Sequence, residues 1–108
     1  MKKRIVLLVI VLTMCFVGTM AYAEKATKNP GEAEFKEHCA LCHPDGGNII
    51  NPKKTLLKRD REANSIRNEA DIVRIMRKPG PGMTPFDEKT ISDNEAKEIA
   101  EYIFKAFK

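Results

Sequence analysis

Five consecutive residues carry the clearest chemical signal in the sequence, Cys39-Ala40-Leu41-Cys42-His43. This C-x-x-C-H pattern is typical of covalent haem attachment. Two thiols three positions apart can form thioether bonds to the two vinyl groups on one side of a porphyrin. The imidazole of the next residue can then bind the iron from one face. We therefore predict one haem c with its iron, attached through Cys39 and Cys42, with His43 as an axial ligand.

Three other interpretations of the motif are weaker. A thioredoxin-like redox pair requires a βαβ context, and no alternating pattern follows Pro44. A structural zinc site requires four ligands, and His38 is too close to Cys39 along the chain to complete a tetrahedron. A disulfide between the two cysteines would close a very small loop and add little stability.

The second axial position has three candidates, namely Met83, Met76 and His38. His38 precedes His43 by five residues and belongs on the same side of the porphyrin, so we expect it to be a half-exposed helical residue. Met76 lies in an apolar helical stripe, where methionine usually fills the core. Met83 lies in a proline-bounded loop that is too polar to be helix core. Met83 is therefore the favoured ligand, while Met76 or an open position remain alternatives.

The elements that must position these residues are helices and loops. A helix is predicted from Pro30 to about Cys39, with Asn29 as its cap. Residues 44–65 are predicted to be irregular because they begin with a cluster of turn formers. The apolar residues of this stretch are expected to lie against the haem edge: Ile49, Ile50, Leu56 and Leu57.

Two further helices have clear start signals. Asn68 is predicted to cap a helix that Pro79-Gly80 ends. Ser92-Asp93-Asn94-Glu95 is a capping box, which starts a last helix to about Phe107. Its apolar stripe has helical spacing and consists of Ala96, Ile99, Ala100, Ile103 and Phe107. We find no strand signal and no internal repeat.

The first 23 residues have the features of a secretory signal peptide. Basic residues at positions 2–4 precede an apolar run over 5–17, and Ala21-Tyr22-Ala23 is a cleavage site of the A-x-A type. Cleavage after Ala23 would leave a single domain over residues 24–108. It would remove three of the 19 basic residues and none of the 15 acidic ones, so the net charge would fall from +4 to +1. We therefore expect neither nucleic-acid binding nor stable membrane insertion after cleavage.

Four stretches of the sequence resemble the class I c-type cytochromes, which are small, soluble and carry a single haem. They are Gly31-x-x-x-Phe35-x-x-x-Cys39-Ala40-x-Cys42-His43, Gly46-Gly47-Asn48 with residues 51–56, Met83-Thr84-Pro85-Phe86 and the C-terminal helix with Tyr102. The family often shows M-P-x-F at the distal ligand, where this chain has M-T-P-F.

The resemblance implies an all-α, class I cytochrome c fold, with three to four helices wrapped around one covalent haem. The first and last helices would cross near Gly31, Phe35 and Tyr102. It implies that His43 donates its other ring nitrogen to a backbone carbonyl, for which Pro52 or Asn51 is the candidate. Phe35, Ile49, Pro52 and Phe86 are expected to support the haem beside the ligands.

These features predict an exported, periplasmic one-electron carrier that is not an enzyme, with His43 and Met83 as axial ligands. The alternative is a haem-based redox or gas sensor with a labile Met83. We expect a monomer whose partners are redox proteins. Residues 53–78 hold nine basic and four acidic side chains, a net charge of +5. These side chains could steer an acidic partner, or could simply be scattered over solvated faces.

Overall fold

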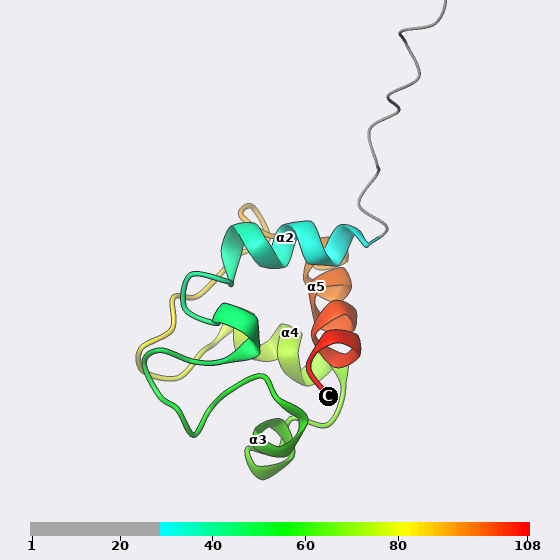
Figure 1. Cartoon of the computed structure of the whole chain (residues 1–108). Coiled ribbons are helices and arrows are strands. Elements are labelled where there is room, and N and C mark those ends of the chain that lie inside the picture. The colour runs from blue at the N-terminus through cyan, green and yellow to red at the C-terminus, as the bar shows by residue number, and fades with distance from the viewer. Residues whose placement is uncertain (1–28) are drawn as a thin grey trace, which may run out of the picture.

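Residues 29–108 are described by a computed structural model, and their regular structure is entirely helical (Figure 1). The elements are α2 (Pro30–His38), the short 3-10 helix η1 (Pro44–Gly46), α3 (Lys58–Ala63), α4 (Glu69–Arg77) and α5 (Asp93–Ala106). The prediction of an all-α fold is confirmed. The predicted signal peptide, residues 1–23, lies outside the described residues. Among residues 29–108, none of the helices has the length and apolar character that a membrane span requires.

Helices α2 and α5 cross at close range (Figure 1). Gly31 of α2 lies where the backbone of α5 approaches it most closely among the described glycines. A Cβ atom on Gly31 would lie only 3.1 Å from the backbone nitrogen of Ile99 and still closer to the carbonyl of Glu98. One turn further along α2, the Phe35 ring contacts Tyr102 and Phe107, with centroid distances of 5.3 and 5.4 Å. The predicted crossing is therefore confirmed.

The apolar core lies where α2 and α4 pack against α5. Buried apolar side chains stabilise a fold by about 1.5–3 kcal/mol each for the larger types. The core consists of Phe35, Ile72, Met76, Ile91, Ala96, Ile99, Ala100 and Ile103. Four of these residues belong to the stripe predicted for the last helix.

Helices α4 and α5 begin at their predicted caps, Asn68 and Ser92, and both starts are reciprocal capping boxes, of which only the second was predicted. The Asn68 side chain accepts from the N–H of Asp71 at 3.0 Å, and the Asp71 carboxylate accepts from the N–H of Asn68 at 3.3 Å. Ser92 and Glu95 form the same pair of bonds, at 3.3 and 2.8 Å. Asn29 occupies the cap position of α2, but its side chain makes no capping bond.

Helix α3 corrects the prediction that residues 44–65 are irregular. Its two buried residues are Asp60 and Arg61, both charged. Asp60 accepts from the Thr55 hydroxyl at 2.6 Å and from Arg59 Nε at 3.0 Å. Because α3 buries charged rather than apolar side chains, it has no apolar periodicity from which a helix could be recognised.

Candidate haem site

The two cysteines of the C-x-x-C-H motif lie in the turn that follows α2. The N–H of Cys39 still donates to Phe35 O at 2.9 Å, and the N–H groups of Cys42 and His43 both donate back to Cys39 O, at 3.2 and 2.9 Å. The two thiols are free, with Cys42 exposed and Cys39 half-buried. Burial raises the pKa of the Cys39 thiol to about 11. The motif is therefore held as a tight turn with both sulfur atoms available for attachment.

The His43 ring is fixed by a hydrogen bond from Nδ1 to the carbonyl of Gly47, at 2.7 Å. A carbonyl can only accept, so Nδ1 carries the proton and Nε2 keeps a free lone pair for a metal. The expected acceptor, Pro52 or Asn51, was wrong. The chain turns back sooner than expected, because Asp45 and Gly46 both have positive φ angles, of 51° and 78°.

A cavity of about 430 Å³ opens in front of the motif. Its size falls within the usual range for cofactor sites. Six of the predicted haem-binding residues line it, namely Phe35, Cys39, Cys42, His43, Met83 and Phe86. The rest of the apolar wall comes mainly from Leu41, Ile50, Leu56, Ile66, Ile72, Ile75, Met76 and Ile103.

Three other residues expected beside the haem do not line this cavity, namely Ile49, Pro52 and Leu57. Ile49 is 63% exposed, and its neighbour Ile50 forms part of the wall instead. Pro52 is exposed, whereas Asn51 lines the cavity. Lys54 is the one charged side chain, other than histidine, among the described residues that line it.

Both methionine candidates reach the cavity, but from different surroundings. Met76 is 3% exposed and packs in the core beside α5. Met83 is half-buried in the loop that follows α4, where Gly82 has a φ of 91°. A methionine that projects from a loop is free to meet a metal, whereas Met76 already fills space in the core.

Arg77 anchors the loop that carries Met83, and sequence analysis missed this role. Its Nη1 donates to the carbonyls of Phe86 and Ile91, at 3.0 and 2.8 Å, and its Nη2 pairs with Asp93 at 2.7 Å. The N–H of Phe86 also donates to Met76 O at 2.8 Å. The segment that follows Met83 is therefore tied back to the C-terminal end of α4. An arginine in the last turn of a helix is too common a feature to have indicated this.

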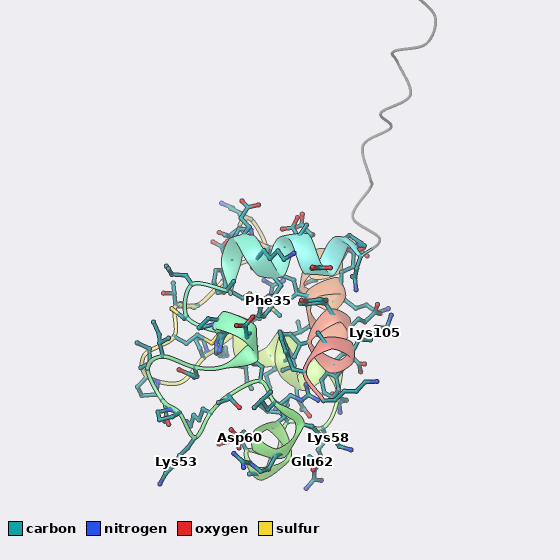
Figure 2. All side chains as sticks on the ribbon, viewed as in Figure 1. Phe35, Lys53, Lys58, Asp60, Glu62 and Lys105 are labelled. Atoms are coloured by element: carbon teal, nitrogen blue, oxygen red, sulfur yellow. The ribbon has the colours of Figure 1, made fainter. Side chains whose placement is uncertain are left out.

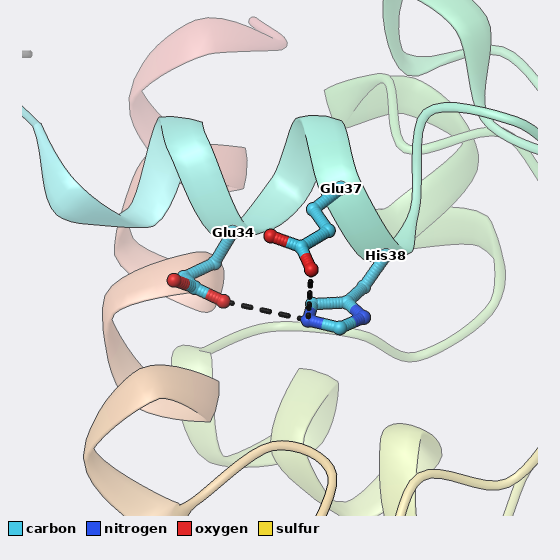
Figure 3. A group of neighbouring side chains, drawn as sticks. All are labelled: Glu34, Glu37 and His38. Carbon is cyan, nitrogen blue, oxygen red and sulfur yellow. Dashed lines mark ion pairs between the residues drawn. The ribbon is translucent and has the colours of Figure 1, made fainter.

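His38 lies at the edge of the cavity, but its Nε2 is turned toward carboxylates (Figure 3). It lies 3.5 Å from Glu34 and 3.9 Å from Glu37, both on the same helix. The side chain is 20% exposed, and its ring centroid is 6.1 Å from that of Phe86. These contacts agree with the expectation of a partly exposed helical residue. The three side chains form an ion-pair group on α2.

The donor atoms around the cavity fit a haem. Two thiols stand next to an imidazole whose Nε2 is free, and a thioether lies in a loop on the same cavity. In c-type cytochromes, two cysteine thiols form thioether bonds to the vinyl groups of the haem. An imidazole and a methionine thioether can serve as the iron ligands. The largely apolar wall suits a porphyrin, which needs to be shielded from water.

Comparison with known proteins gives the same class. Residues 26–103 match the family described as cytochrome c oxidase, cbb3-type, subunit III. Cytochrome c6 of Porphyra purpurea is 33% identical over 103 residues, covering 95% of this chain and 93% of that protein. The structure of OmcF, the outer membrane cytochrome F of Geobacter sulfurreducens, is 46% identical and covers 72% of this chain and 99% of its own, with a TM-score of 0.70. Oxidised cytochrome c6A of Arabidopsis thaliana is 34% identical, covers 71% and 87%, and has a TM-score of 0.66.

A helical fold around a cavity that holds the C-x-x-C-H motif defines a class I c-type cytochrome with one haem. The predicted class I fold is confirmed by the similarity to OmcF and cytochrome c6A. Within that class, the chain belongs to the family of small cytochromes that includes cytochrome c6, and it carries one covalently bound haem c.

Proposed function

We propose that this chain is a one-electron carrier, rather than an enzyme, with His43 and Met83 as the two axial ligands of its haem iron. The observation that carries the proposal is that His43, with a free Nε2, and Met83 line one cavity together with Cys39 and Cys42. When bound there, haem supplies a one-electron couple at an iron with no open position for oxygen or peroxide.

The chain's own residues suit this role because they are held in place. The Gly47 carbonyl fixes the orientation of the His43 ring and makes Nε2 a better donor. Arg77 holds the loop that carries Met83 through its hydrogen bond to the carbonyl of Phe86. If both ligands stay in place in the two oxidation states, little rearrangement accompanies electron transfer. Lys54, beside Asn51 and Thr55, is suited to face the haem carboxylates.

We further propose that the chain is exported to the periplasm and cleaved after Ala23, leaving residues 24–108 as a monomeric domain that exchanges electrons with redox proteins. The support is the order of basic, apolar and small residues at positions 2–23. The mass of the intact purified protein tests this proposal. We expect Glu24 as the first residue and the added mass of one haem that survives denaturation.

The ligand assignment is tested with two matched substitutions, Met83→Ala and Met76→Leu. The first should abolish the sulfur-to-iron absorption band of the ferric protein and let carbon monoxide bind the ferrous protein. The second keeps an apolar side chain of similar volume in the core and should change neither property. Loss of the band in Met76→Leu alone would contradict the assignment. Carbon monoxide binding to the unaltered protein would favour the sensor alternative.

A further inference from the structure

Arg61 is a buried charge that has no carboxylate partner among the described residues. It is 3% exposed, and none of the ion pairs within 4.0 Å in residues 29–108 includes it. Neighbouring Asp60 bonds to Thr55 and Arg59 instead. Burial lowers the pKa of the Arg61 guanidinium from its ordinary value, because the charged form loses water. A buried charge is costly unless hydrogen bonds or a counter-ion compensate it.

The protein satisfies only one end of this guanidinium. Nη1 donates to the carbonyls of Leu56 and Ile103, at 3.0 and 3.1 Å. Its Cζ lies over the Phe104 ring, 4.2 Å from the ring centroid. Nε and Nη2 of Arg61 make no hydrogen bond to residues 29–108. Both nitrogens keep some exposure, because no fully buried side-chain nitrogen or oxygen among these residues lacks a partner. The Nε–H and Nη2–H donors of Arg61 are therefore without an acceptor among the described residues.

Arg61 lines a second cavity, of about 440 Å³. This cavity lies between α3 and the C-terminal end of α5, and Figure 2 shows Lys58 and Glu62 on the α3 side. Four of the seven residues that line it are cationic, namely Lys58, Arg61, Arg67 and Lys108. Glu62 is its one acidic side chain and pairs with Lys58 at 3.9 Å. The excess of positive charge remains at Arg61, Arg67 and Lys108.

We propose that this cavity binds a small oxyanion of the phosphate class, with the Arg61 guanidinium as its central ligand. A planar guanidinium with one edge already fixed presents parallel donors that match two oxygens of a phosphate. The cation–π contact with Phe104 helps to hold the guanidinium in place before the anion arrives. The cavity is larger than one phosphate group requires, so pyrophosphate should bind more tightly than inorganic phosphate. The site is separate from the haem ligands and does not depend on the proposed electron transfer.

The direct test is a titration of the holoprotein, labelled with ¹⁵N, with inorganic phosphate and with pyrophosphate. Sodium chloride keeps the ionic strength constant. We expect saturable shifts of the Arg61 Nε–H signal and of the Arg67 and Phe104 amides, with a phosphate Kd on the order of 1 mM. Shifts that stay linear in concentration, or that spread over all exposed lysines, would overturn the proposal.

Charge variants at the rim give the sharper result, because they leave Arg61 and the core intact. Arg67→Gln should weaken pyrophosphate binding by about fivefold to tenfold, the effect of losing one charge-assisted contact. Glu62→Gln should strengthen binding, because it removes the one negative charge of the wall. Lys105→Gln, on the exposed face of α5 (Figure 2), is the matched control and should change the affinity by less than about twofold. If Arg67→Gln and Lys105→Gln weakened pyrophosphate binding equally, the anion would be attracted by the general surface charge, and the proposed site would be refuted.

Discussion

Replacement of Gly31 by alanine tests the helix crossing on which the whole fold depends. A Cβ at this position would lie 3.1 Å from Ile99 N and closer still to the carbonyl of Glu98, whereas ordinary contact begins near 3.4 Å. Both neighbours are backbone atoms within α5, so neither can rotate away. The added methyl group must therefore push α2 and α5 apart, which also loosens the contacts of Phe35 with Tyr102 and Phe107.

The size of the effect follows from two opposing terms. Overpacking of this kind costs about 1–3 kcal/mol, and the rigid partners place Gly31→Ala near the upper end. Alanine is a better helix former than glycine by up to about 1 kcal/mol, which acts in the other direction. We expect a net loss of about 2 kcal/mol. For a domain of this size that loss lowers the Tm by roughly 8–16 °C.

The assay is thermal unfolding of the holoprotein, followed by far-ultraviolet circular dichroism. Gly80→Ala is the matched control, because no heavy atom of residues 29–108 lies within 4 Å of a Cβ built there and its φ is not in the left-handed region. This variant should stay within about 0.5 kcal/mol of the unaltered protein. If Gly31→Ala melts at the same temperature as Gly80→Ala, or above it, the close approach of α2 to α5 is refuted.

Three further predictions concern the haem, the pH and a partner. Cys39→Ser with Cys42→Ser should give largely unfolded protein by circular dichroism, and a cooperative melt of that chain would contradict a cofactor-dependent core. The N–H groups of Arg67 and Asn68, together with Arg74, lower the pKa of Asp71. Asp71 should therefore stabilise the fold above its ordinary pKa and lose that contribution as the pH falls through its folded pKa. In urea unfolding, the unaltered protein should have a higher free energy of unfolding than Asp71→Asn at neutral pH, and this difference should shrink below about pH 4. Electron transfer to an acidic partner should slow with added salt, because the Debye length is only ~8 Å at physiological ionic strength. Lys53→Glu should weaken that salt dependence more than Lys105→Glu, and equal effects of the two variants would show that Lys53 does not steer the partner.

The parts of the fold that could be predicted from sequence are those with local causes. The start of α4 follows from its cap residue Asn68, and that of α5 from a capping box that spans only four residues. The buried face of α5 follows from its apolar period. The haem-attachment motif after α2 was recognisable because its two cysteines and histidine are adjacent in the sequence, whereas the turn that it forms was not predicted. Placing Met83 beside the cavity needed only the contrast between a proline-bounded loop and a helix core.

The parts that could not be predicted depend on contacts between distant residues. Arg61 is buried because it reaches the carbonyl of Ile103, 42 positions away, and the ring of Phe104. Nothing in the sequence around α3 distinguishes it from the exposed Arg59. The acceptor of His43 was missed because it depends on backbone angles at Asp45 and Gly46, and the choice of Ile50 over Ile49 has no periodicity to guide it.

The core and the haem cavity share part of their walls, which explains why a chain this short can fold. Phe35, Ile72, Met76 and Ile103 belong to the buried cluster and also line the cavity. Without a cofactor, these side chains would have one face packed and the other toward a space of about 430 Å³. Small domains bury too little apolar surface to remain folded when part of the core faces water in this way. The haem site is therefore continuous with the core, and the ligands are held by the same contacts that hold α2, α4 and α5 together.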